Sequence, residues 1–106
     1  MKGVRLTIFT SEMQKHRGKR MYEWLLEFAK EHSLHGGSAF RALTGYGRHG
    51  RMHGEHFFEL ASDVPVEVVF VMSSTEAKSF LLALKNEEIS LMYVLSDVEY
   101  GSLTST

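Results

Sequence analysis

The side chains best suited to chemistry lie between Thr44 and His56, where closely spaced glycines alternate with arginine and histidine. Glycine lets a ligand approach the main chain, while arginine and histidine supply charge that a stable core does not need. This composition predicts that the loop is the functional loop of the molecule. No recognised enzyme motif accompanies it, so we expect a binding protein and not an enzyme.

Three histidines in this loop raise the question of metal binding. His49, His53 and His56 are spaced by four and three residues, so they meet on one metal ion only if the loop is helical or folded back. A threefold axis offers another route, because it gathers one histidine from each subunit. We expect His16, His32 and His35, by contrast, to be ordinary surface residues.

Composition indicates one domain spanning residues 1–106. The chain has 43% hydrophobic and 24% charged residues, and its net charge of -1 argues against a nucleic-acid partner. The absence of cysteine excludes disulfides, thiolate catalysis and cysteine-based zinc sites. Apolar runs stay well below the ~18 residues of a membrane span, and no secretory signal precedes the first strand, so we expect a cytoplasmic protein.

The regular elements that must hold this loop follow from periodicity and from turn residues. Gly36-Gly37 predicts the end of the first helix, Pro65 suits the start of a strand, and Ser73 with Glu76 has capping-box spacing. The resulting prediction is a strand at 4–9, a loop at 12–18, a helix at 19–32, a strand at 38–46, an arm of the loop at 57–60, a strand at 64–72, a helix at 73–86, a strand at 89–100 and a polar tail at 102–106.

This order predicts an α+β ferredoxin-like βαββαβ fold, an antiparallel four-stranded sheet with both helices on one face. Phe9, Val69 and Val71 are out of phase with the residues that face the helices, so the other face of the sheet is also expected to be apolar. Several copies packed around a symmetry axis would bury it.

A set of landmarks in this order resembles a known family. The landmarks are Gly18-Lys19, Tyr22-Glu23, Gly36-Gly37, Thr44-Gly45-Tyr46-Gly47, His53, Leu60, Ser62-Asp63-Val64-Pro65-Val66 and Asp97-Val98-Glu99. They resemble the bacterial and archaeal PII-like proteins long labelled as a domain of unknown function, which are related to the nitrogen regulatory PII signal proteins. The resemblance implies a ferredoxin-like homotrimer that binds small effectors between subunits.

The same resemblance assigns roles to the loop at 47–59, which corresponds to the T-loop of PII proteins. In PII proteins the T-loop contacts a protein target. We expect the loop at 47–59 to do the same, with a membrane transporter as the target. The implied effector is an adenine nucleotide, and Gly45, Tyr46 and Gly47 would contact it. The runner-up interpretation is a divalent-metal-binding protein similar to CutA, which would use the loop histidines.

The phosphate-binding residues of PII proteins are only half matched. The segment Lys85-Asn86-Glu87-Glu88 has two acids and no glycine, and no Lys or Arg follows Tyr100. Charge for an anionic ligand would come from Arg48 and Arg51, or from a basic segment near the start of the first helix, where backbone N–H groups favour anions. That segment contains Lys15, Arg17, Lys19 and Arg20, of which Arg17 and Lys19 are our candidate ligand-binding residues.

Overall fold

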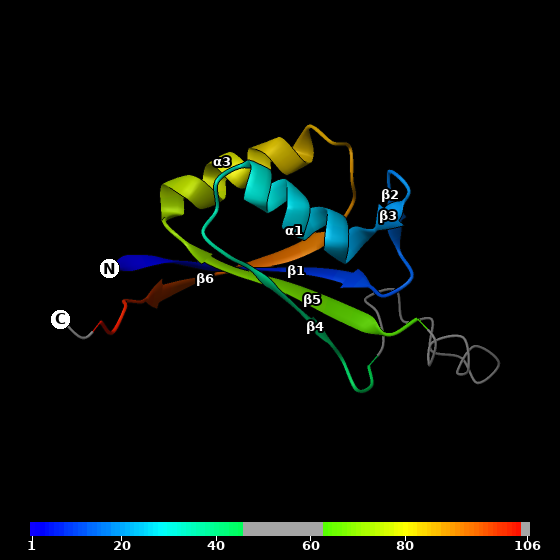
Figure 1. Cartoon of the computed structure of the whole chain (residues 1–106), viewed down its shortest axis with the longest axis horizontal. Coiled ribbons are helices and arrows are strands. Elements are labelled where there is room, and N and C mark those ends of the chain that lie inside the picture. Colours follow the sequence, from blue (N-terminus) through cyan, green and yellow to red (C-terminus); the bar gives the residue numbers. More distant parts are fainter. Residues whose placement is uncertain (46–62, 105–106) are drawn as a thin grey trace.

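A four-stranded antiparallel sheet carries both helices on one face in the computed structural model, which describes residues 1–45 and 63–104 (Figure 1). The strands lie in the order β4-β5-β1-β6. The predicted α+β ferredoxin-like fold is confirmed. The elements are β1 Lys2–Ser11, α1 Met21–Glu31, β4 Ser38–Arg41, β5 Pro65–Met72, α3 Ser74–Lys85 and β6 Met92–Glu99.

The core lies between the sheet and the helices. Val4, Leu6 and Ile8 of β1 point toward it, and their register partners on β5 point the same way, because opposed residues of an antiparallel pair share a face. The helices contribute apolar stripes at 3.6-residue spacing. Their buried members are Met21, Trp24, Leu25 and Ala29 of α1, and Ala77, Phe80 and Leu84 of α3.

The start of α3 follows the predicted capping box. The Glu76 carboxylate accepts a hydrogen bond from the Ser73 backbone N–H at 3.0 Å, and the Ser73 hydroxyl accepts one from the Glu76 N–H at 3.1 Å. The backbone hydrogen bond from Ser73 lowers the pKa of Glu76, since it favours the ionised form. This local pairing satisfies donors that a helix start otherwise leaves free.

The predicted loop at 12–18 is wrong in part, because it contributes to a small hairpin. β2 (Lys15–His16) pairs with β3 (Lys19–Arg20), and the turn between them has left-handed φ angles of 52° at Arg17 and 80° at Gly18. Two consecutive left-handed residues suit the twist of a tight hairpin. Since Lys19–Arg20 belongs to β3, α1 begins at Met21 and not at Lys19.

The helix predicted at 19–32 ends within one residue of the predicted end, but the prediction that Gly36-Gly37 stops it is wrong. α1 ends at Glu31, and Ser33 takes the left-handed position with φ 64°. The Leu34 N–H donates to the Ala29 carbonyl at 3.1 Å and the Ser33 N–H to the Lys30 carbonyl at 3.0 Å. This is the Schellman pattern, and Leu34 packs against the core as its apolar anchor.

Two strands are shorter than predicted. β4 pairs with β5 alone, and β5 begins at Pro65, so the ladder stops near Ala42, whose N–H donates to the Pro65 carbonyl at 2.9 Å. The strand predicted at 38–46 therefore ends at Arg41. The strand predicted at 89–100 spans only Met92–Glu99. The arm predicted at 57–60 lies outside the described residues.

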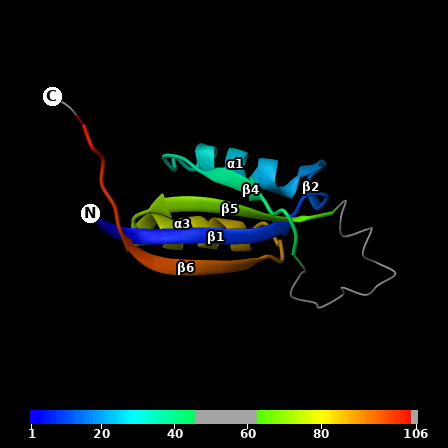
Figure 2. The same cartoon turned by 90° about the horizontal axis from the view of Figure 1, so that it is seen from below.

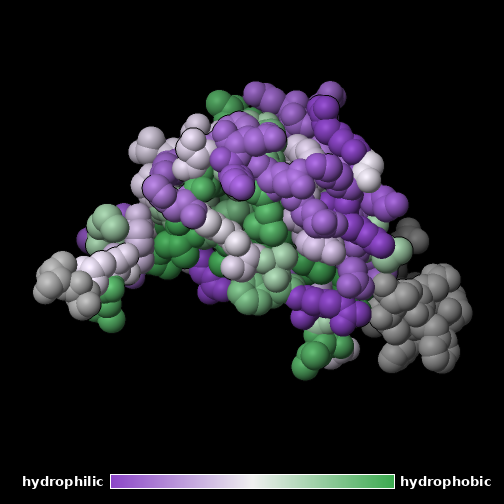
Figure 3. Space-filling model, viewed as in Figure 1, coloured by the Kyte–Doolittle hydropathy of each residue, from purple (hydrophilic) through white to green (hydrophobic). Residues whose placement is uncertain are grey.

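The helices leave one face of the sheet open (Figure 2). As predicted, this face carries apolar side chains. Val94 on β6, Thr7 on β1 and Val69 on β5 form one row across this face by register. Exposed apolar side chains flank the row on three strands: Phe40, Val71 and Met92. In contrast, hydrophilic side chains gather over the helices at the top of Figure 3.

Candidate functional site

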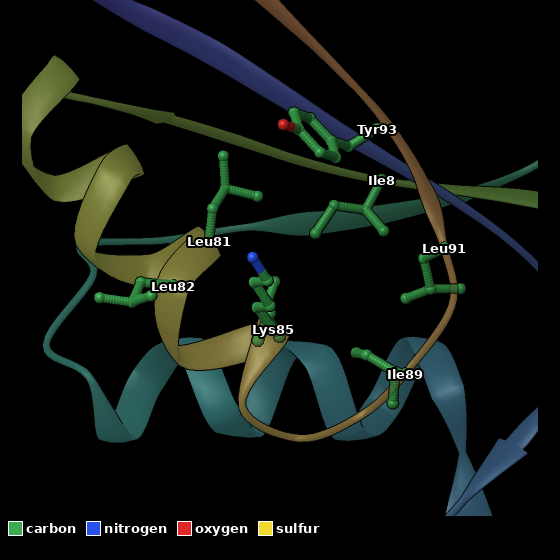
Figure 4. A pocket seen from close by; sticks show the side chains of 8 residues that line it. Ile8, Leu81, Leu82, Lys85, Ile89, Leu91 and Tyr93 are labelled. Carbon is green, nitrogen blue, oxygen red and sulfur yellow. The ribbon is translucent and has the colours of Figure 1, made fainter.

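A pocket of about 390 Å³ opens between the C-terminal half of α3, its connection to β6, and the sheet (Figure 4). This volume lies in the range of small-ligand sites, which is roughly 300–1,000 Å³. Most of its wall is aliphatic. The lining residues are Ile8, Leu81, Leu82, Leu84, Lys85, Ile89, Leu91 and Tyr93.

Two side chains give the pocket polar character. Lys85 projects from α3 among the aliphatic groups, and Tyr93 contributes its ring and hydroxyl from β6 (Figure 4). An apolar wall with one ammonium group suits a flat ring that carries an anionic substituent. Sequence reasoning treated Lys85 only as part of an incomplete phosphate site and missed Tyr93, because the pocket joins elements that are separate in the chain.

The basic segment before α1 does not converge on an empty anion site. Arg17 Nε lies 3.0 Å from Glu87 Oε1, and the Lys19 ammonium pairs with Glu27. The hydrogen bond to Glu27 raises the pKa of Lys19. Arg20 Nη1 donates to the Glu12 carbonyl at 3.1 Å. The ligand-binding roles of Arg17 and Lys19 therefore stay predictions. To bind an anionic ligand, Arg17 would have to release Glu87 and Lys19 would have to release Glu27.

His16 is not the ordinary surface residue that its sequence context predicts. Its side chain is 17% exposed, its Nε2 lies 3.2 Å from Glu87 Oε1, and its ring meets Trp24 edge-on at a centroid distance of 4.4 Å. Trp24 in turn stacks on Phe28 at 4.6 Å. The β2–β3 hairpin is thus fixed to α1 by aromatic contact and to the α3–β6 connection by Glu87.

Sequence comparison agrees with this architecture over nearly the whole chain. Residues 3–100 match the DUF190 family, described as "Uncharacterized ACR, COG1993". The chain belongs to the DUF190 family. A UPF0166 protein from Aquifex aeolicus (strain VF5) is 40% identical over 94 residues, which cover 89% of each chain.

Solved structures similar to this DUF190 protein are PII-like. CPII from Thiomonas intermedia K12, bound to ADP and bicarbonate, matches with a TM-score of 0.67 and 17% identity over 96% of this chain and 91% of that chain. A putative PII-like signaling protein from Thermus thermophilus matches with a TM-score of 0.62 and 16% identity over 92% and 87%. The fold is therefore PII-like, as the sequence resemblance implied.

Much of the predicted ligand-binding set falls outside the described residues. Gly45 is described, and a Cβ placed on it would lie 3.3 Å from the Pro65 ring. The other predicted loop residues, Tyr46, Gly47, Arg48 and Arg51, lie outside, as do His49, His53 and His56. Their roles stay predictions.

Within residues 1–45 and 63–104, no three His, Asp or Glu side chains are grouped as a metal site. Neither helix of this DUF190 chain's described part has the length and apolarity of a membrane span.

The Glu87 contacts predict a pH-dependent contribution to stability. The hydrogen bond from His16, and then the Arg17 charge, lower the pKa of Glu87 below its ordinary value of about 4.3. Because the ionised form is favoured by folding, its stabilisation is present above the unfolded pKa and is lost as pH falls through the folded pKa. We expect Glu87→Gln to lower the free energy of unfolding at neutral pH. The deficit should shrink as pH falls below the ordinary carboxyl pKa of about 4.3, and it should vanish once the pH is below the lowered pKa of Glu87 in the folded protein.

Urea unfolding at a series of pH values measures this deficit. Glu88→Gln is the matched control, because it removes the same charge from the neighbouring residue, for which the described residues show no ion pair. A deficit for Glu87→Gln that stays constant from neutral pH to acid would contradict the assignment.

Proposed function

We propose that this DUF190 protein is a homotrimeric PII-like regulator that binds a small effector, an adenine nucleotide, and contacts a protein target through the loop at 47–59. The pocket between α3 and β6 on a PII-like sheet is the observation that carries the proposal. ADP and AMP are named as ligands of CPII from Thiomonas intermedia K12, which supports an adenine nucleotide as the effector class. The role is binding without catalysis.

The open face of the sheet supports assembly. Apolar side chains from all four strands reach this face, and monomeric proteins rarely leave such a surface uncovered. Copies of the same face packed around a threefold axis would cover it in a closed assembly. The loop at 47–59 would contact the target, for which a membrane transporter remains our expectation.

The pocket supplies groups that suit a nucleotide. The adenine ring would pack between the aliphatic wall formed by Leu81 and Ile89 and the ring of Tyr93. The Lys85 ammonium would attract the phosphates, and Arg48 and Arg51 would add charge from the loop. A charge-assisted hydrogen bond of this kind contributes about 1.5–3 kcal/mol.

Calorimetric titration with ADP tests the proposal. We expect binding to the parent protein, and a loss of affinity of about tenfold or more in Lys85→Gln and in the double variant Arg48→Ala/Arg51→Ala. Lys78→Gln is the matched control, because Lys78 is an exposed lysine of α3 two helical turns away that does not line the pocket. Absence of ADP and AMP binding at millimolar concentration would refute an adenine-nucleotide effector.

A further inference from the structure

Two neighbouring side chains at the tip of the β2–β3 hairpin share one carboxylate oxygen. His16 Nε2 lies 3.2 Å and Arg17 Nε 3.0 Å from Oε1 of Glu87. His16 and Glu87 are mostly covered, with side chains 17% and 20% exposed, whereas Arg17 is 67% exposed. The hairpin tip therefore presents a pair of hydrogen-bond donors to a single anionic group.

The hairpin backbone and the His16 ring are held in place by contacts that do not involve Glu87. The tight turn through Arg17 and Gly18 sets the backbone, with φ of 52° and 80°, and His16 pairs with Lys19 across the hairpin. The ring of Trp24, only 8% exposed, packs against the His16 ring and fixes its orientation. The preorganised turn and His16 ring therefore lose little freedom when an anion binds.

Glu87, whose carboxylate accepts from both donors, belongs to the connection between α3 and β6. It lies two residues after Lys85, the last residue of α3, and Glu88 beside it has a left-handed φ of 60°. Its backbone N–H donates to the Leu84 carbonyl at 3.0 Å, so the main chain is anchored independently of the carboxylate. The side chain can leave the hairpin by rotation, without breaking a helix or a strand.

A phosphate group is the ligand chemistry best able to replace this carboxylate. Glu87 is tethered, so its effective concentration at the hairpin is on the order of millimolar or more, and a simple monocarboxylate would compete poorly. Pyrophosphate carries more charge and several oxygens, and the guanidinium of Arg17 offers further N–H donors to it. The exposure of Arg17 leaves that group accessible from solvent.

We propose that the His16–Arg17 tip is a binding site for a phosphate or pyrophosphate group, and that Glu87 occupies it as an autoinhibitory contact in the free chain. The site goes beyond the nucleotide pocket between α3 and β6, since it uses residues that do not line that pocket. An incoming phosphate group would release Glu87 and with it the contact between the hairpin and the α3–β6 connection.

Inorganic pyrophosphate is the probe, and calorimetry measures its binding. We expect Glu87→Gln to bind pyrophosphate about tenfold or more tightly than the parent, because the internal competitor has lost its charge. Glu88→Gln removes an equal charge one residue away and should change the affinity by less than about twofold. Adding Arg17→Gln to Glu87→Gln should return the affinity to the parent value or below.

Equal gains in Glu87→Gln and Glu88→Gln, no gain in either, or a gain that survives Arg17→Gln would each overturn the proposal. Circular dichroism confirms that the variants are folded. As a second measurement on the parent protein, saturating pyrophosphate should shift the NMR signals of the His16 ring, and unchanged His16 signals would also overturn the site. Failure of ADP to bind would refute the nucleotide effector while leaving these pyrophosphate results standing.

Discussion

A single lysine in place of Val94 should convert the assembled protein into folded monomers. Val94 lies on β6, an edge strand, where it faces the open side of the sheet opposite Thr7, and it is 44% exposed in the single chain. In the proposed trimer the new ammonium would be buried in every subunit, at a cost of about 3–5 kcal/mol for each unpaired charge. Each copy would thus weaken assembly by about a hundredfold or more.

Lysine is the sharper choice than an acid at this position. Arg5 lies on the same face, two residues from Thr7 along β1, so an added carboxylate would find a nearby cation whereas an added ammonium would not. In the monomer the lysine would remain hydrated, so the fold should survive.

Sedimentation equilibrium distinguishes the outcomes. Leu103→Lys is the control, because it introduces the same charge at an apolar residue in the C-terminal tail that is fully exposed and lies outside the sheet. We expect the control to sediment as the parent does. A Val94→Lys protein that stays assembled, or a parent protein that is monomeric at micromolar concentration, would remove the open face as the assembly surface.

Replacing Gly37 by alanine should lower the free energy of unfolding by about 1–3 kcal/mol, the usual cost of overpacking a core. A Cβ at Gly37 would lie 2.6 Å from Cδ1 of Phe70 and 3.1 Å from Leu26 Cδ2. Phe70 is 1% exposed and packs against Phe80, so its ring has little room to move.

Gly36→Ala provides the matched control on the adjacent residue. A Cβ there meets no atom within 4 Å, so the substitution should leave stability unchanged or raise it by up to about 1 kcal/mol through the unfolded chain. Both variants change the unfolded chain alike, so their difference isolates the clash with Phe70. Urea unfolding at equal protein concentration measures it, and equal midpoints would show that the core accommodates the methyl group.

Features whose interacting residues lie close together in the chain could be predicted from the amino-acid sequence. Apolar residues at helical spacing located α1 and α3, Ser73 and Glu76 defined a helix start, and Pro65 indicated the start of β5 to within one residue. Such patterns are readable because each residue interacts within about four positions of itself. Strand alternation likewise indicated two apolar faces of one sheet, and the landmark motifs indicated the PII-like family.

Local signals failed where two of them competed. Gly36-Gly37 looked like a helix stop, yet α1 ends earlier, where the chain turns at the left-handed Ser33 and the partly buried Leu34 packs against the core. Gly37 serves a different purpose, since it leaves space for the ring of Phe70. Arg17 and Gly18 form a hairpin turn, whereas the polar residues around them had indicated a loop.

The candidate sites were decided by tertiary structure alone. His16 and Glu87 are 71 positions apart in the chain and meet because β2 and the α3–β6 connection pack at the same end of the sheet. The pocket likewise joins Ile8 of β1 to Leu81 of α3 and Tyr93 of β6. Periodicity determines which face of a helix or strand is buried. Which polar groups then meet depends on how elements that are far apart in the chain pack together, and no local sequence pattern encodes that packing.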